Sequence, residues 1–337
     1  MRARRVTGLL AAIVASVLSM ATAASGADFY RGKTLTVVVG FAPGGGVDTT
    51  ARVVANHLVR FIPGEPALVV QNMEGAAGLV AMNYVEKRVA ADGLTIAVPG
   101  RSWYVEGALR GPGIAFDVDK LTYIGSPGGV NSSLYVRTAT GVDSLAKLKN
   151  APKPLTFGTL GSTTPTAMVP ALLAAAGFPV KLISGYISTA RVLLALEQGE
   201  VDGFWTVDDS FARRHDLIEK NIVRPIMQTR PHYPGVPVLG DLLPEDKRPL
   251  LMLLEAPENF GLPIVGPAGI PPERVDILRK AFLAMAADSD FQADAIKAEQ
   301  PVGSPITGDQ LAAMIQELAK AATPDIVAAY RQLGAAK

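Results

Sequence analysis

The sequence predicts an α/β fold in which two domains each contain a mainly parallel sheet flanked by helices. The chain has 337 residues, a length that suits two domains. Short apolar runs alternate with stretches of helical periodicity, and this alternation favours parallel strands joined by right-handed crossovers. The order strand, loop, helix, strand, loop, helix, turn, strand occurs twice, over residues 35–98 and 155–207. These observations together indicate two α/β units of similar architecture.

The N-terminus has the features of a secretory signal peptide. A basic segment, Met1–Arg5, precedes the apolar and uncharged run Val6–Ala23, and small residues follow up to Ala27. We therefore expect residues 1–27 to be a signal peptide that is cleaved between Ala23 and Ala27. An uncleaved anchor helix is the alternative, but polar residues interrupt the run, and a membrane span needs about 20 apolar residues.

The composition restricts both the location and the partners of the protein. The chain contains no cysteine, so we expect no disulfide and no lipid-modified N-terminal cysteine. The mature protein is therefore expected to be periplasmic without a lipid anchor, and to act as a monomer. Removal of the signal peptide takes away three arginines and lowers the formal net charge from +1 to −2. This near-neutral balance argues against nucleic acid as a partner.

In the first unit, a β-branched apolar run ends just before three consecutive glycines, Gly44–Gly46. The run suits a strand that is covered on both faces, and the glycines allow a tight turn with close approach of a ligand. Asp48, Thr49 and Thr50 are typical of a helix start. The elements expected in this unit are strands at 35–39, 67–71 and 94–98 and helices at about 48–60 and 79–90.

The second unit repeats this order with loops at 159–164 and 185–190. Its expected elements are strands at 155–158, 180–184 and 204–207 and helices at about 165–176 and 191–198. Elsewhere we expect strands at 133–137 and 222–228, a strand, turn and helix start within 262–272, and helices at about 143–150, 273–286, 289–298, 309–320 and 323–333. Residues 117–125 are expected to be a connection, and the proline-rich segment 230–237 to cross between domains. The expected division is therefore residues 28–125 with 235–337 in domain 1 and residues 126–234 in domain 2.

The loop Gly40–Asp48 is the best candidate for a binding site. A glycine-rich turn before a helix points unpaired backbone N–H groups at one place, where an anion is stabilised. The loop lacks the Gly-Lys-Ser/Thr of a P-loop and a clean GxGxxG register. Asp48 would repel a phosphate dianion unless its side chain turns away as a cap, so a carboxylate fits better. A purely structural turn is the alternative.

Several segments together resemble the Bug family, the extracytoplasmic solute receptors of tripartite tricarboxylate transporters. They are Gly40–Asp48 followed by Ala51-Arg52, Ile62–Gly64, Val70–Gly78, Ala91–Leu94, Leu193–Asp202 and Val265–Pro271, in family order along nearly the whole mature chain. The resemblance implies a two-domain periplasmic binding protein of the Venus-flytrap type, with a small carboxylate in the cleft and integral membrane transporter subunits as partners. It also implies that backbone groups and bridging waters hold the carboxylate, in agreement with four loops that carry no Arg or Lys at their tips. The loop 159–165 departs from the family pattern.

Parallel strands place a ligand crevice at their carboxyl ends, where the four loops lie. The residues expected to contact the ligand are Phe41, Ala42, Pro43, Gly44, Gly45, Gly46 and Asp48 of the first loop, Gly75 and Ala76 of the second, Gly161, Ser162, Thr163 and Thr164 of the third, Tyr186, Thr189 and Ala190 of the fourth, and Trp103, Trp205 and Asp208. Helix capping by the hydroxyl residues and core packing by the tryptophans are the alternative interpretations.

The pair Asp208-Asp209 has three interpretations: a helix cap, metal or acid–base chemistry, or contact with a positively charged ligand group. The three histidines are far apart in the sequence, and the chain has no cysteine, so we expect no metal site and no cofactor. No GxSxG motif is present, and we expect no catalytic residue. Two other functions remain open, an exported α/β enzyme that binds a nucleotide at Gly40–Asp48 and a solute sensor for a signalling partner.

Overall fold

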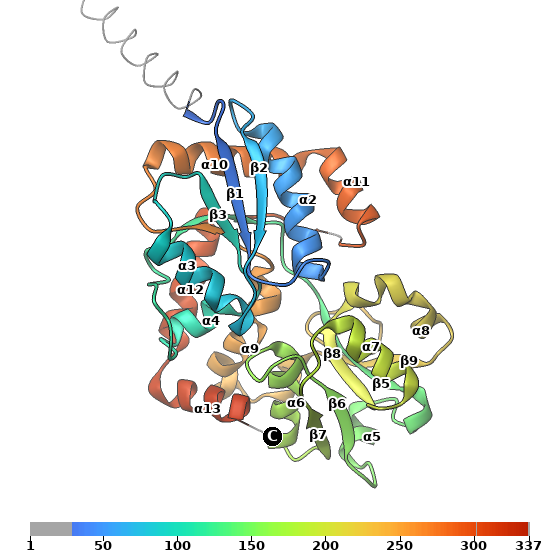
Figure 1. Cartoon of the computed structure of the whole chain (residues 1–337). Coiled ribbons are helices and arrows are strands. Elements are labelled where there is room, and N and C mark those ends of the chain that lie inside the picture. The colour runs from blue at the N-terminus through green and yellow to red at the C-terminus, as the bar shows by residue number, and fades with distance from the viewer. Residues whose placement is uncertain (1–28, 301, 336–337) are drawn as a thin grey trace, which may run out of the picture.

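The computed structural model describes residues 29–300 and 302–335, which form two mixed β-sheets flanked by helices (Figure 1). The expected signal peptide, residues 1–27, lies outside the described residues. Among the described helices, none is long and apolar enough to cross a membrane. The predicted fold class is confirmed, since most strands within each sheet run in the same direction.

The first sheet has six strands in the order β11-β4-β10-β3-β1-β2. Their bounds are β1 (Thr34–Val39), β2 (Ala67–Asn72), β3 (Thr95–Val98), β4 (Thr122–Ser126), β10 (Ile264–Gly266) and β11 (Ile306–Thr307). Strand β1 pairs in parallel with β2 and β3, whereas β10 runs antiparallel to both β3 and β4. The expectation of a connection over 117–125 is wrong, because β4 begins at Thr122. Gly125 in this strand leaves room for the Phe282 ring, which an added Cβ would approach to 2.3 Å.

The second sheet has five strands in the order β7-β6-β8-β5-β9. Their bounds are β5 (Ser132–Arg137), β6 (Leu155–Gly158), β7 (Val180–Ile183), β8 (Gly203–Val207) and β9 (Val223–Gln228). Strand β5 runs antiparallel to its neighbours β8 and β9. Strand β5 is the first strand that the chain contributes to this sheet, and it enters directly from β4 of the first sheet.

Twelve helices are described, and most follow the strands as the sequence predicts. Their bounds are α2 (Gly46–Phe61), α3 (Leu79–Arg88), α4 (Trp103–Ala108), α5 (Leu145–Lys149), α6 (Pro165–Ala175), α7 (Thr189–Gln198), α8 (His215–Glu219), α9 (Arg248–Phe260), α10 (Pro272–Ala287), α11 (Ser289–Lys297), α12 (Gly308–Ala321) and α13 (Pro324–Ala335). Short 3₁₀ helices include η1 (Ala76–Gly78), η2 (Thr138–Thr140), η3 (Asp208–Arg214), η4 (Leu239–Leu242) and η5 (Glu245–Lys247). Sequence analysis did not predict α4, α8 and α9. Helix α9 carries a proline in its first turn and Pro257 in its interior.

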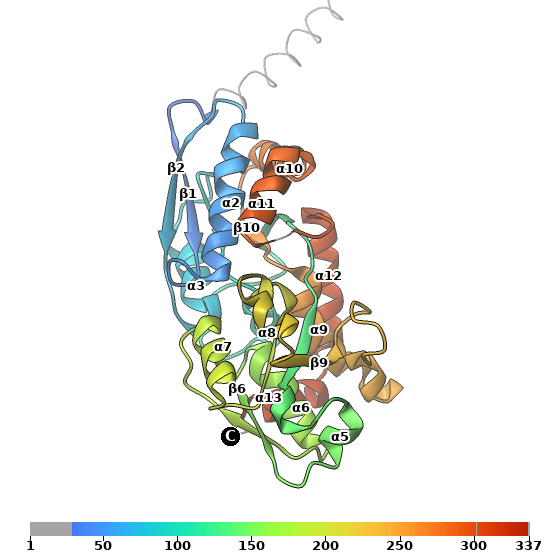
Figure 2. The same ribbon diagram turned by 90° about the vertical axis from the view of Figure 1, so that its right-hand side faces the viewer.

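The alternation of side chains along β1 divides the first unit into two apolar layers. Val37 and Val39 face a cluster that contains residues of α2, α10 and α11, whereas Val38 faces the opposite cluster with α3, α4 and α12. This period of two is the pattern of a strand covered on both faces. Figures 1 and 2 show α2, α10 and α11 grouped beside this sheet.

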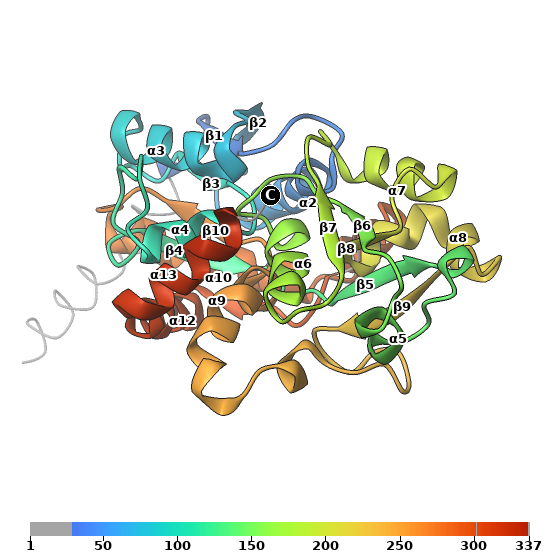
Figure 3. The same cartoon turned by 90° about the horizontal axis from the view of Figure 1, so that it is seen from below.

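Helices join the two sheets into one body. The cluster that contains Val38 continues through α9 and α6 to Trp205 of β8, so one apolar core reaches both sheets. Helix α13 packs against α6 and α9, although it follows the last strand of the first sheet in sequence. Figure 3 shows α13 beside α6. The chain passes between the sheets over residues 127–131, from β4 to β5, and over residues 229–263, from β9 to β10.

Candidate functional site

The loops that follow β1, β2 and β3 meet at the carboxyl edge of the first sheet. A Cβ added to Gly40 or Gly78 would lie 2.2 or 2.0 Å from the carbonyl oxygen of Pro99. The Phe41 ring fills the space beside Gly100, where an added Cβ would be 2.4 Å away. Because only glycine fits at these positions, the three loops pack as one unit.

The first loop is held by a hydrogen-bond network centred on Asp48. The carboxylate, which is 2% exposed, accepts from the Gly44 backbone N–H at 2.8 Å, from Arg52 Nε at 2.9 Å and from Asn72 Nδ2 at 2.7 Å. Asn72 Nδ2 also donates to the Phe41 carbonyl at 2.8 Å, which ties the loop to the end of β2. Asp48 therefore organises the loop, and the expected contact between Asp48 and the ligand stays a prediction.

The same network determines the pKa of Asp48. It leaves two backbone N–H groups of the loop without an acceptor. Burial alone would raise the pKa of this carboxyl group, but hydrogen bonds from Arg52, Asn72 and Gly44 outweigh burial and lower it. Helix α2 begins at Gly46 with Gly45 as its N-cap, and no side chain caps it. In the described part of the chain, no acceptor pairs with the backbone N–H groups of Gly45 and Gly46. These two groups are free to bind an anion at the positive end of the helix.

The second loop holds a strained backbone beside the first. Gly75, Ala76, Ala77 and Gly78 have φ values of 134°, 46°, 53° and 95° in succession. A left-handed conformation costs a residue with a side chain roughly 1–2 kcal/mol, and such strain clusters at functional sites. The predicted site residues Gly75 and Ala76 are both exposed here.

In the second sheet, one hydroxyl group of the loop after β6 forms hydrogen bonds within the loop itself. Thr164 is the N-cap residue of α6, but its Oγ1 donates to the Gly161 carbonyl at 2.7 Å and pairs with Thr166. Ser162 is exposed and Thr163 is half-buried, and neither hydroxyl has a hydrogen-bond partner among the described residues. Ser162 and Thr163 are therefore the available donors of this loop.

The loop after β7 leads into α7. Ser188 is the N-cap residue and accepts from the Arg191 backbone N–H, so Thr189 and Ala190 form the first turn, as predicted for a helix start. Tyr186 is half-buried against an apolar cluster that contains Val192 of α7 and Phe204 of β8. Burial raises the pKa of its hydroxyl, with Glu200 adding to the effect.

Both tryptophans are core residues in this structure. Trp103 and Trp205 are each 0% exposed, and Trp103 packs edge-on against Tyr104 and Phe116. This placement supports core packing over the alternative of a cleft wall.

The end of β8 brings acidic side chains to the junction between the sheets. Asp208 Oδ1 accepts from the Tyr135 hydroxyl at 2.9 Å, and the Ser133 hydroxyl also lies near enough to this carboxyl group to lower its pKa. Asp209 has no hydrogen-bond or ion-pair partner among the described residues. Burial raises the pKa of both carboxyl groups. Neither aspartate is a helix cap, because Val207 is the residue that precedes η3.

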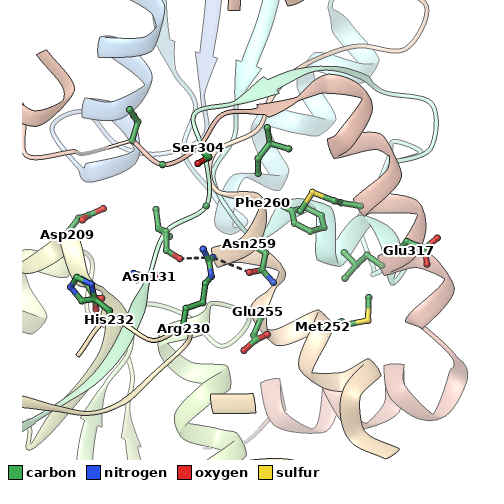
Figure 4. Close-up of a pocket in the computed structure, with 18 of the residues that line it drawn as sticks. Asn131, Asp209, Arg230, His232, Met252, Glu255, Asn259, Phe260, Ser304 and Glu317 are labelled. Atoms are coloured by element: carbon green, nitrogen blue, oxygen red, sulfur yellow. Dashed lines mark hydrogen bonds between the residues drawn. The ribbon is translucent and has the colours of Figure 1, made fainter. Parts of the chain in front are cut away.

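A cavity of about 950 Å³ lies at this junction. Figure 4 shows Asp209 and His232 on one side of the segment that carries Asn131, and Met252 and Glu317 on the other. Of the predicted site residues, only Asp208 lines the cavity. Arg230 borders it, and its Nη2 donates to the carbonyls of Val130 and Glu258 and to Asn259 Oδ1. The cavity therefore extends from the end of β8 past the crossing segment, away from the glycine loop.

Sequence analysis missed a charged residue at the carboxyl end of β3. Arg101 follows directly after Gly100, and its Nε is buried with no hydrogen-bond partner. Burial lowers the pKa of the Arg101 guanidinium, although Glu258 and Asp209 lie near enough to oppose the shift. The signal that could have revealed it is an arginine placed three residues after the end of a buried central strand.

Glu258 of α9 is a second buried charged residue that the sequence did not reveal. It is 3% exposed, and its Oε1 accepts from the Ser132 hydroxyl at 3.1 Å. Burial raises the pKa of this carboxyl group to about 7, against the lowering effects of Ser132, Trp205 and Arg101. No group of three or more potential metal ligands is found among the described residues.

The comparisons with known proteins agree with this architecture. Residues 50–216 match the model of the tripartite tricarboxylate transporter family receptor. The chain belongs to this receptor family. The receptor is a solute-binding protein of a transporter, and not an enzyme, so the exported-enzyme alternative is excluded.

Individual relatives of this receptor are distant. The UPF0065 protein of the tcbD-tcbE intergenic region in Pseudomonas sp. strain P51 is 26% identical over 242 residues, which cover 69% of this chain and 70% of that protein. Protein BugT of Bordetella pertussis is 34% identical over 145 residues, 42% of this chain and 44% of that protein. The structure of MatC from Rhodopseudomonas palustris with bound malate has a TM-score of 0.65 at 22% identity and covers 88% of this chain and 99% of MatC. The last likeness establishes the fold, a two-domain periplasmic binding protein.

Proposed function

We propose that this receptor captures a small organic carboxylate in the periplasm and delivers it to the integral membrane subunits of a tripartite transporter. The observation that carries the proposal is the pair of unpaired N–H groups, Gly45 and Gly46, at the start of α2. The bound malate of MatC supports the ligand class. The proposed mature receptor is a monomer, with residues 28–125 and 235–337 in one domain and residues 126–234 in the other.

The proposed mode of binding uses one loop from each sheet. The N-terminus of α2 carries roughly half a positive charge, which favours a carboxylate beside Gly45 and Gly46. Each hydrogen bond to a charged group contributes about 1.5–3 kcal/mol. The free hydroxyls of Ser162 and Thr163 offer donors from the second sheet. Rotation about the crossing segments 127–131 and 229–263 would close the two sheets on the ligand.

The test is a titration of the purified receptor with malate, succinate, adipate and benzoate, and with ATP and NAD as negative controls. We expect at least one carboxylate to bind with a Kd of roughly micromolar or tighter, and neither nucleotide to bind. Binding of a nucleotide, with none of the carboxylates, would overturn the proposal.

A pair of variants locates the binding site on the loop. Gly45 has an ordinary φ of −79°, and an added Cβ meets only the Ala42 carbonyl at 3.6 Å, so side chains fit without strain. Gly45→Val places a branched side chain beside the free N–H groups and is expected to weaken binding at least a hundredfold. It should lower the melting temperature by only a few degrees, because valine is a poorer N-cap residue than glycine. Gly45→Ala is the matched control with a smaller loss. Full affinity in Gly45→Val would show that the loop is only a turn.

A further inference from the structure

We propose that Gln300 is a positioning residue for the bound carboxylate, and that it acts by holding the first turn of α2 through the hydroxyl group of Thr50. The assignment rests on the proposed function, because it takes the backbone N–H groups of Gly45 and Gly46 as the anion site. Gln300 lies just beyond the end of α11 and is 250 positions away from Thr50 in the sequence. No local pattern therefore relates the two residues.

The side chains of Gln300 and Thr50 meet at the start of α2. The Thr50 hydroxyl can donate to the Gly46 carbonyl, one helical turn earlier, or to Gln300 Oε1, and each acceptor is 2.9 Å away. A hydroxyl group has a single hydrogen, so Thr50 shares it between these two acceptors. A Cβ added to Gly46 would lie 3.6 Å from Gln300 Oε1 and 3.9 Å from Gln300 Nε2. The Gln300 amide group therefore lies directly beside the first residue of the helix.

Helix α11 holds Gln300 in this position. Nε2 of His57 in α2 lies 3.0 Å from Asp294 Oδ2, and the His57 ring packs edge-on against Phe291, which is 1% exposed. The backbone N–H of Gln300 donates to the Ala295 carbonyl at 2.9 Å. Figures 1 and 2 show α11 beside α2. The backbone of Gln300 is thus fixed relative to the helix that its side chain contacts.

The first turn of α2 depends on such a contact because its own sequence restrains it weakly. Gly45 is the N-cap residue, and no side chain caps the helix. Glycine lacks the side-chain oxygen with which Ser, Thr, Asp or Asn fixes a helix start, and it has the most backbone freedom of all residues. Asp48 restrains Gly44, and the bridge through Thr50 supplies a second restraint at Gly46. Loss of the bridge should let the free N–H groups spread over more directions and so weaken binding.

A double-mutant cycle in ligand affinity tests the bridge. The ligand is whichever of malate, succinate, adipate and benzoate binds the wild type most tightly. Thr50→Val and Gln300→Leu keep similar side-chain volumes but remove the hydrogen bond, and each is expected to weaken binding roughly three- to tenfold. The double variant is expected to bind no more weakly than the weaker single variant, because all three lack the same bond.

The outcomes of the cycle separate this assignment from the proposed function. Wild-type affinity in both single variants, or losses that multiply in the double variant, would overturn the role of the bridge and leave the proposed function intact. Absence of binding by every acid to the wild type would refute both.

A charge at position 300 gives a readout that a purely structural role would not change. Gln300→Glu keeps the size of the side chain and an acceptor for Thr50, but it places a negative charge beside Gly46. We expect binding to weaken at least tenfold at low salt, and the loss to shrink as the ionic strength rises. Gln292→Glu is the matched control on α11, because Gln292 is exposed and donates to the Ala286 carbonyl, and it should keep wild-type affinity. A loss in Gln300→Glu that does not depend on salt, or that equals the effect of Gln292→Glu, would contradict the placement of Gln300 beside the bound anion.

Discussion

Replacement of Asp48 by alanine tests whether one buried carboxylate orders the first loop. In the wild type, Asp48 accepts from Gly44, Arg52 and Asn72 over distances of 2.7–2.9 Å. The Arg52 side chain is 42% exposed and can be solvated after the change, and Asn72 keeps its bond to the Phe41 carbonyl. The loss therefore corresponds to about one or two charge-assisted hydrogen bonds, or about 2–3 kcal/mol.

The assay is thermal unfolding followed by circular dichroism. A loss of about 2–3 kcal/mol lowers the melting temperature by roughly 5–10 °C for a domain of this size. Asp290→Ala is the control, because Asp290 is 72% exposed and its pair with Arg60 at 3.7 Å contributes little. A melting temperature of Asp48→Ala within about 1 °C of the wild type would refute the role assigned to the network.

The same residue gives a pH dependence with a defined sign. The hydrogen bonds lower the pKa of Asp48 in the folded state below its ordinary value. The stabilisation is therefore present above the pKa of the unfolded chain and is lost as the pH falls through the folded pKa. We expect the stability difference between wild type and Asp48→Ala to shrink under acidic conditions. A difference that stays constant down to about pH 2 would contradict this origin.

Three further changes probe other parts of the site. Ala76→Gly and Ala77→Gly should each raise the free energy of unfolding by about 0.5–1 kcal/mol, because glycine adopts the left-handed φ of 46° and 53° without strain. A lower melting temperature in thermal unfolding would contradict the strain. Gly78→Ala should lower the melting temperature by several degrees and weaken ligand binding, because the added Cβ would lie 2.0 Å from the Pro99 oxygen. An unchanged melting temperature and affinity would show that the loops are not packed as described. Glu258 has a pKa of about 7 in the folded protein, above its unfolded value, so its ionisation costs stability as the pH rises through the interval between the two values. Glu258→Gln should therefore be more stable than the wild type at pH 8 but not at pH 5. A gain in stability that is the same at both pH values would show that ionisation of Glu258 is not its cause.

The elements with strong local signals were predictable from the sequence. The β-branched run predicted strand β1, and the glycines predicted a turn before a helix. The structure shows both, with α2 beginning at Gly46. Strand β4 was missed because its five-residue sequence, Thr-Tyr-Ile-Gly-Ser, carries a weak local signal and is stabilised by pairing with β10, which lies far along the chain. Helix α9 was missed because two prolines obscure its apolar face, which packs against α12 and α6.

The candidate site was predictable only where local sequence defines a loop. Gly45 and Gly46 carry free N–H groups because a glycine turn and a helix start are adjacent, a pattern visible in the sequence. The acidic residues that influence the pKa of Arg101 are Glu258 of α9 and Asp209 after β8, more than one hundred positions later in the chain. Their proximity depends on the packing of the two sheets, which no local pattern encodes.

A crystal structure of the receptor isolated from its native host without unfolding, with its solute retained, tests the central claim most directly. We predict a carboxylate oxygen of the solute about 2.7–3.2 Å from the backbone nitrogens of Gly45 and Gly46, with the second sheet closed over it. A solute bound elsewhere, such as beside Met252 in the junction cavity, with these two N–H groups unoccupied, would contradict the claim.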